Sequence, residues 1–113
     1  MLAQTKCLLI EETPLPAQLY QTHLNCKVSI AHSIQHLLDI LSTNSLFEIV
    51  IVDNLFPFYQ QFLPAILKKT QASQLLVMCG DEQEKLRLNH LKNITFVDAP
   101  FDFEALSSAI KSI

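Results

Sequence analysis

The sequence predicts an α/β fold: a doubly wound, five-stranded parallel sheet with helices on both faces, in one domain of residues 1–113. Five short apolar runs alternate with longer segments of helical periodicity, which is the pattern of consecutive βαβ units. Half of the 113 residues are hydrophobic, enough to cover both faces of a sheet. No internal repeat or linker-like stretch divides the chain, so a single domain is expected.

The first strand is expected over residues 6–10, an apolar run that stops at Glu11 and Glu12. Thr13 is predicted to cap the first helix, with Pro14 at the first helical position, where a missing backbone N–H does no harm. The apolar positions that follow recur at helical spacing: Leu15, Leu19, Tyr20 and Leu24.

A second strand is expected over residues 26–31, followed by a helix that Ser33 caps. The apolar face of that helix consists of Ile34, Leu37, Leu38 and Leu41. Residues 47–52 are the strongest strand candidate because the run is β-branched and almost wholly apolar. Such a run predicts a central strand that is covered on both faces.

The third helix is expected over residues 58–69, and Pro64 within it predicts a late start or a kink. A fourth strand over residues 74–79 follows. Asp81 is then predicted to cap a polar helix that ends near residue 91.

A fifth strand is expected over residues 94–98, and Asp102 is predicted to cap the last helix. The apolar side of that helix consists of Phe103, Leu106, Ile110 and Ile113. Ligands of doubly wound sheets bind at the carboxyl ends of the strands, so functional residues are expected just after each strand.

Composition excludes several classes of function. The chain has one glycine, Gly80, so neither of the glycine-rich phosphate loops of nucleotide-binding proteins can be built. The net charge is −3 and only Lys68 and Lys69 stand side by side, so we expect neither a nucleic-acid partner nor a membrane partner. No Ser-His-Asp or Cys-His arrangement has support from spacing, so no enzyme activity is expected.

Three cysteines, and the lack of a secretory or membrane-spanning apolar segment, indicate a cytoplasmic protein with reduced thiols. The spacing of four residues is reminiscent of a zinc site: His23, Cys26, His32 and His36. Because the predicted elements need not bring these residues together, ordinary histidines are the favoured interpretation.

Carboxylates follow two of the expected strands: Glu11 and Glu12 the first, and Asp53 the third. If these strands are neighbours, the three carboxylates converge and repel one another unless they are solvated, protonated or bridged by a cation. Magnesium suits such a set of oxygens. The alternative is an acidic, solvated edge of the sheet without a metal.

At these positions the sequence resembles a known family, the CheY-like receiver domains of bacterial two-component response regulators. Glu11 and Glu12 correspond to the acidic pair after the first strand of that family. Asp53, with Pro57 four residues later, corresponds to the phosphoacceptor aspartate. The other matched positions are Cys79 and Gly80 after the fourth strand, Phe96 on the fifth, and Ala99, Pro100 and Phe101 beyond it.

The resemblance extends from Lys6 to Ile113 and implies a flavodoxin-like sheet with strand order 2-1-3-4-5. It implies that Asp53 accepts a phosphoryl group from a phosphohistidine. Magnesium would be held by Asp53, by a carboxylate of the Glu11–Glu12 pair and by the backbone carbonyl of Leu55. Its implied partners are a sensor histidine kinase, a phosphotransfer protein or an output protein.

Three departures from the family pattern weaken this site. Ala99 stands at the position of the lysine that pairs with phosphoryl oxygens, and Cys79 at that of a hydroxyl donor, for which a thiol is a weak substitute. Both acidic positions are glutamates, one methylene longer than aspartate, so any magnesium would bind weakly. No other lysine is expected nearby, because the following basic residues fall in helices or their connections: Lys68, Lys69, Lys85, Arg87 and Lys92.

The favoured interpretation is therefore a degenerate receiver that acts by protein–protein contact, with Cys79, Gly80, Phe96 and Ala99 at the switch and phosphate-pocket positions. One alternative is a functional Asp53 phosphoacceptor with Mg²⁺, and another is a flavodoxin-like binder of a small ligand. A homodimer through the fourth helix, fifth strand and fifth helix is a further expectation. On the fourth helix the predicted surface is of mixed charge: Glu82, Glu84, Lys85, Arg87 and Lys92.

Overall fold

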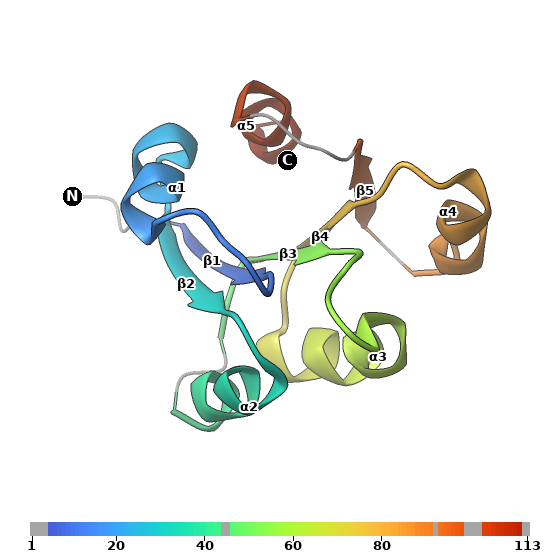
Figure 1. Cartoon of the computed structure of the whole chain (residues 1–113), viewed down its shortest axis with the longest axis horizontal. Coiled ribbons are helices and arrows are strands. Elements are labelled where there is room, and N and C mark those ends of the chain that lie inside the picture. Colours follow the sequence, from blue (N-terminus) through green and yellow to red (C-terminus); the bar gives the residue numbers. More distant parts are fainter. Residues whose placement is uncertain (1–4, 44–45, 92, 99–102, 112–113) are drawn as a thin grey trace.

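The computed structural model describes residues 5–43, 46–91, 93–98 and 103–111. Strands and helices alternate along the described chain (Figure 1). The strands are β1 (Lys6–Ile10), β2 (Lys27–Ala31), β3 (Ile49–Asp53), β4 (Gln74–Met78) and β5 (Ile94–Val97). The helices are α1 (Ala17–Leu24), α2 (Ile34–Thr43), α3 (Tyr59–Thr70), α4 (Glu82–Leu88) and α5 (Phe103–Lys111).

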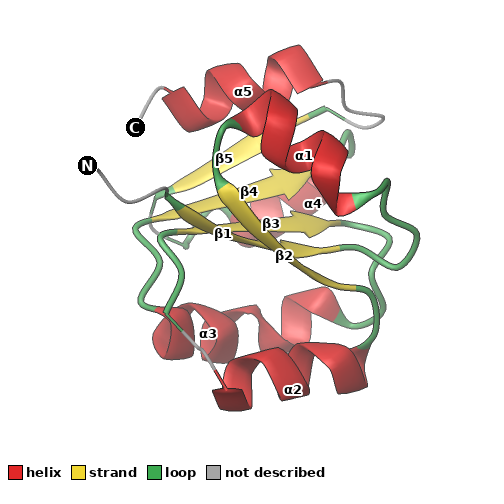
Figure 2. Cartoon of the chain, turned by 90° about the vertical axis from the view of Figure 1, so that its left-hand side faces the viewer, coloured by secondary structure: helices red, strands yellow, loops and turns green. Residues whose placement is uncertain are grey.

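The five strands form one sheet in the order β2-β1-β3-β4-β5, and every neighbouring pair is parallel. The predicted doubly wound architecture and its 2-1-3-4-5 order are thus confirmed. Figure 2 shows α1 and α5 on one face of the sheet and α2 and α3 on the other. Because β1 and β4 flank β3, the residues that follow these three strands meet at one edge of the sheet.

The alternation of side chains along β3 divides the core into two layers. Val50 and Val52 belong to the cluster beneath α2 and α3, whereas Ile49 and Ile51 belong to the cluster beneath α1 and α5. All four side chains are buried, as expected of a central strand with both faces covered. No helix of the described chain is long and apolar enough to span a membrane.

The first helix begins later than predicted, at Ala17, and Thr13 does not cap it. Pro16 occupies the N-cap position in an extended conformation (φ −56°, ψ 138°). A proline disfavours the helical conformation of the residue before it, which keeps Leu15 out of the helix. Leu15 and, on the outer side of α1, Leu19 are exposed, whereas Tyr20 and Leu24 provide the buried face.

Two predicted helix caps are confirmed. The Ser33 side chain accepts a hydrogen bond from the His36 backbone N–H at 3.1 Å, and Asp81 accepts one from that of Gln83 at 3.0 Å. The apolar face of α2 is narrower than predicted, because Leu37 and Leu41 are buried but Ile34 and Leu38 are exposed. The helix after Asp81 ends at Leu88 rather than near residue 91. Asp102, the predicted cap of the last helix, and Ile113, a predicted member of its apolar side, lie outside the described residues.

Pro64 does not delay the start of α3, which already begins at Tyr59. A proline cannot donate to the carbonyl four residues earlier, here that of Gln60. Pro64 lies on the exposed side of the helix, where water can satisfy that carbonyl, while Leu63 and Ile66 on the other side are buried.

Candidate functional site

Asp53 is the last residue of β3 and its half-buried side chain turns back onto the following loop. The Leu55 N–H donates to Asp53 Oδ1 at 3.0 Å, and the Phe56 N–H donates to the Asp53 carbonyl at 3.0 Å. The Asn54 N–H donates to the carbonyl of Met78 on β4, which ties the start of this loop to the sheet. One carboxylate oxygen of Asp53 is therefore held by the backbone of its own loop.

Glu11 follows β1, and its N–H donates to the Ala31 carbonyl at 3.0 Å. Its side chain is 8% exposed, and Oε2 accepts a hydrogen bond of 3.1 Å from the Tyr20 hydroxyl. The Leu15 N–H donates in turn to that hydroxyl at 3.2 Å. The loop after β1 is thus connected to α1 through a continuous chain of hydrogen bonds.

Burial raises the pKa of Glu11, the Tyr20 hydrogen bond acts in the opposite direction, and the nearby negative charge of Asp53 raises it further. Burial also raises the pKa of Tyr20 to about 12. The Tyr20 hydroxyl therefore keeps its proton at neutral pH and acts as the donor to Glu11.

The predicted magnesium ligands are not gathered into one set. Glu12 is exposed, and no group of three or more His, Cys, Asp or Glu side chains among the described residues is placed to hold a metal ion. Glu11 and Asp53 influence each other electrostatically, but the hydrogen bond to Tyr20 occupies Glu11 Oε2. Magnesium is usually held by only one or two carboxylates together with water, so the number of carboxylates at this edge is sufficient for it. The ligand assignment to Glu11, Glu12, Asp53 and the Leu55 carbonyl stays a prediction.

Cys79 lies directly after β4 and is fully buried in the core cluster beneath α2 and α3. Its N–H donates to the Val97 carbonyl at 2.8 Å, and its Sγ accepts a hydrogen bond from the Asp81 N–H at 3.4 Å. The neighbouring Gly80 is exposed. The thiol therefore belongs to the turn into α4 rather than to the solvent-facing edge of the sheet.

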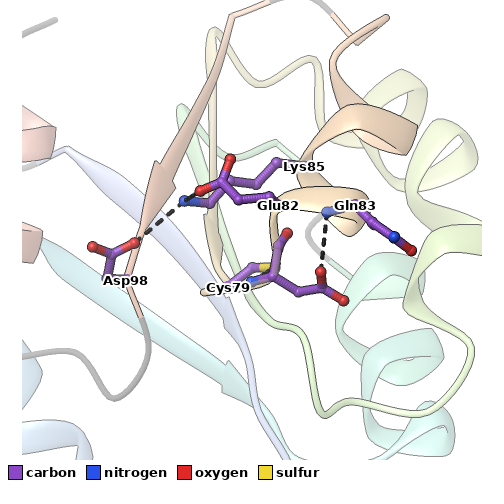
Figure 3. A network of polar contacts seen from close by, with 6 residues as sticks. Cys79, Glu82, Gln83, Lys85 and Asp98 are labelled. Atoms are coloured by element: carbon purple, nitrogen blue, oxygen red, sulfur yellow. Dashed lines mark hydrogen bonds and ion pairs between the residues drawn. The ribbon is translucent and has the colours of Figure 1, made fainter.

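Lys85 lies on α4, as expected of a helical residue, and its side chain lies beside the end of β5. Its Nζ lies 3.3 Å from Asp98 Oδ1 and 3.4 Å from Glu82 Oε1, as Figure 3 shows. The same Nζ lies 5.9 Å from the ring centroid of Phe96 on β5. The hydrogen bond to Asp98 raises the pKa of Lys85, so it is a permanent cation beside β5. Ala99, which follows Asp98, lies outside the described residues.

The expectation of a solvated, mixed-charge α4 is wrong for Glu84, which is only 8% exposed. Its carboxylate accepts hydrogen bonds from the Tyr59 hydroxyl, from Asn54 Nδ2 at 3.4 Å and from Gln60 Nε2 at 3.4 Å. Glu84 thereby joins α4 to the loop after Asp53 and to the start of α3. No sequence signal distinguishes it from its exposed neighbour Glu82, because both stand in the same polar helical segment.

The residues with zinc-like spacing are engaged in separate contacts. The His23 ring stacks on Phe103 with ring centroids 4.3 Å apart, and the rings of His32 and His36 lie 4.4 Å from each other. Cys26 is buried and belongs to the same core cluster as Cys7.

No protein-family model and no curated protein matches the sequence. Solved structures nevertheless share the fold. The chemotaxis response regulator CheY4 of Vibrio cholerae matches with a TM-score of 0.78 at 16% identity, over 97% of this chain and 98% of that one. The receiver domain of HemR from Leptospira biflexa matches with a TM-score of 0.77 at 21% identity, over 96% and 93% of the two chains.

A response-regulator receiver domain protein from Bacillus halodurans matches with a TM-score of 0.67 at 23% identity, over 96% of both chains. Together with the strand order, these similarities define the class: the chain has the fold of CheY-like response-regulator receiver domains. Asp53 ends the central strand of that fold, and Glu11 lies beside it at the end of β1.

Proposed function

We propose that this chain is a receiver-like module of two-component or phosphorelay signalling that acts mainly by protein–protein contact and not as an enzyme. Asp53 occupies the phosphoacceptor position, but it is modified inefficiently. The partners are a sensor histidine kinase, a phosphotransfer protein or an output protein in the cytoplasm. The receiver fold supports the signalling class, and the residues around Asp53 support the degenerate state.

The observation that carries the proposal is the environment of the phosphoacceptor position. Phosphoryl transfer depends on positioning and on neutralisation of negative charge. Cys79, which stands at the position of the family's hydroxyl residue, is buried, and its Sγ accepts a hydrogen bond from the Asp81 N–H. Ala99, which stands at the position of the family's lysine, has an uncharged side chain. A charge-assisted contact is worth about 1.5–3 kcal/mol, so its loss weakens a phosphorylated state by roughly tenfold or more.

Intact-mass spectrometry after incubation with acetyl phosphate and MgCl₂ tests the proposal. We expect the wild-type mass to be unchanged, or a small fraction to gain one phosphoryl group. The double variant Cys79→Thr/Ala99→Lys restores a hydroxyl and a cation and is expected to be labelled more fully. Stoichiometric labelling of the wild type that Asp53→Asn abolishes would contradict the proposal and would favour a functional Mg²⁺-dependent phosphoacceptor.

Contact with a partner, or with a second copy of the chain, is proposed through α4, β5 and α5. Leu86 on α4 is 67% exposed, and an exposed leucine next to Arg87 offers an apolar centre with a charged rim. Sedimentation of the wild type and of Leu86→Glu tests the homodimer: a dimer that the variant dissociates is the expected result. A wild type that stays monomeric at high concentration leaves contact with a different protein as the function of this surface.

A further inference from the structure

We propose that the groove between α4 and the loop after β3 binds an extended, acidic peptide segment of a partner protein. The inference deepens the proposed function, because it assumes that the chain acts by protein–protein contact and names the chemistry of one partner. The groove has a volume of about 500 Å³, within the range of ligand-binding clefts. Residues 54–61 line it, together with Glu84 and Arg87 of α4.

The loop contributes two exposed apolar side chains to the groove, Leu55 at 77% and Phe58 at 66% exposure. Between them, Phe56 is buried in the core, and its ring packs edge-on against Phe62 with centroids 6.0 Å apart. The N–H groups of Leu55 and Phe56 donate to Asp53, which fixes the same loop. The exposed side chains therefore belong to a segment that is already ordered, and this order lowers the entropic cost of binding a partner.

The backbone of Phe58 is a second indication that this loop contacts a ligand. Its φ of 58° lies in the left-handed region, which is unfavourable for a residue with a Cβ atom. Asn25 and Gln71 have similar φ values, but they end helices, and each donates its N–H to a carbonyl of the last turn. Phe58 instead precedes α3, and its side chain makes no capping hydrogen bond. Strained backbone of this kind concentrates at binding sites, and here it presents an exposed aromatic ring.

The charges of the groove favour an acidic partner. Arg87 is exposed and forms no ion pair with any residue that the structure describes. The carboxylate in the lining, that of Glu84, is 8% exposed and accepts hydrogen bonds from three side chains of the groove. A partner therefore meets the guanidinium of Arg87 rather than the carboxylate of Glu84. A guanidinium binds a carboxylate through two parallel hydrogen bonds, so Asp or Glu is the complementary residue.

Two amide side chains of the groove suit the backbone of a peptide. Asn54 Nδ2 and Gln60 Nε2 each donate to Glu84 at 3.4 Å. An amide that donates through its nitrogen can still accept through its oxygen, and a peptide N–H is a suitable donor. Together with the apolar side chains of the loop and the cation of Arg87, these groups match an extended segment that carries an apolar residue and an Asp or Glu.

The test is a selection from a random library of short peptides displayed on phage, with the immobilised full chain as the target. Selected peptides are synthesised with a fluorescent label, and fluorescence anisotropy gives their dissociation constants for the wild type and for variants. We expect the selected sequences to combine an apolar residue with Asp or Glu. Binding should shift the amide resonances of residues 54–61 and 84–87.

Phe58→Gly and Arg87→Glu should each weaken binding of the selected peptides about tenfold, because they remove the apolar anchor and the cation. The matched controls are Leu38→Ser and Lys69→Glu, which change an exposed leucine and an exposed lysine outside the groove and should leave the affinity unchanged. Phe58→Gly relieves backbone strain, so weaker binding by this variant cannot result from lost stability, and urea denaturation checks that every variant is folded.

Failure to select any peptide would overturn the inference, and so would peptides that either Phe58→Gly or Arg87→Glu binds as tightly as the wild type does. A wild-type dimer that both substitutions dissociate would also overturn it, because the groove would then hold a second copy of the chain. The mass measurement on Asp53 does not depend on these affinities. Stoichiometric labelling of Asp53 therefore contradicts the proposed function alone, and unchanged peptide affinities contradict this inference alone.

Discussion

Tyr20 and Tyr59 each donate a hydroxyl hydrogen bond to a glutamate that is 8% exposed, and the two pairs lie on opposite faces of the sheet. Glu11 has Tyr20 as its side-chain donor and lies close to the negative charge of Asp53. Glu84 accepts from three side chains that belong to the loop after β3 and to α3.

The difference follows from the elements that each glutamate joins. Glu84 connects α4, a helix of seven residues, to two other segments, and a buried carboxylate with several donors is well satisfied. Glu11 is held within one loop and one helix, and its hydrogen bond from Tyr20 offsets only part of the cost of burying its charge. We therefore expect the Glu84 pair to contribute more to stability than the Glu11 pair does.

The largest expected effect is the removal of the Glu84 carboxylate. Glu84→Ala leaves the Tyr59 hydroxyl without its acceptor in the interior and should lower the free energy of unfolding by about 2–3 kcal/mol. Urea denaturation measures the change, and Glu82→Ala on the exposed side of the same helix is the control. If the two alanine variants were equally stable, Glu84 would not join the three segments.

A smaller change in the free energy of unfolding, of opposite sign, is expected for a substitution next to Tyr59. Phe58 precedes Tyr59 with a left-handed backbone (φ 58°), which a residue with a Cβ atom adopts at a cost, and its side chain is 66% exposed. Phe58→Gly relieves this strain with little loss of burial and should stabilise the protein by about 1 kcal/mol.

The control for Phe58→Gly is a second residue with a positive φ, at the C-terminal end of α1. Asn25 has φ 53° there, and asparagine tolerates this conformation, so Asn25→Gly should change the stability much less. Thermal unfolding compares the two variants. A destabilised Phe58→Gly would mean that the exposed ring makes a favourable contact that outweighs the backbone strain.

The pH dependence of stability should carry a contribution from Glu11. Because the pKa of Glu11 is raised in the folded protein, the folded state binds the proton more tightly than the unfolded state does. This contribution is present at acidic pH and is lost as the pH rises from the ordinary value of 4.5 through the raised one. Glu11→Gln should remove this part of the pH profile of unfolding, and the exposed Glu12→Gln is the charge-matched control.

The smallest effect is expected for the ion pair of Lys85 and Asp98. Both ends are accessible to solvent, so a double-mutant cycle with Lys85→Gln and Asp98→Asn should give a weak coupling that falls as salt is added. A strong coupling that resists salt would show that this pair, like that of Glu84, fastens α4 to the sheet.

Local patterns in the sequence were sufficient for the fold and for part of the edge around Asp53. The apolar runs predicted the five strands, the resemblance predicted their order, and Ser33 and Asp81 were identified as caps. These features depend on periodicity and on side-chain-to-backbone bonds within a few residues, which the sequence displays directly. The same logic places Asp53 at the end of the central strand.

The delayed start of α1 also has a local cause, because Pro16 restrains Leu15, although Thr13 and Pro14 offered a more familiar signal. What only the tertiary structure decided is which polar side chains become partners. Glu84 and Glu82 are indistinguishable along the chain, yet only Glu84 faces Tyr59 once α4 lies beside α3. Likewise Lys85 reaches Asp98, and Tyr20 reaches Glu11, across helices and strands that the chain brings together. Burial and hydrogen bonding of long polar side chains depend on how helices and strands pack against one another in space. The hydrophobic periodicity of the sequence carries no information about these partners.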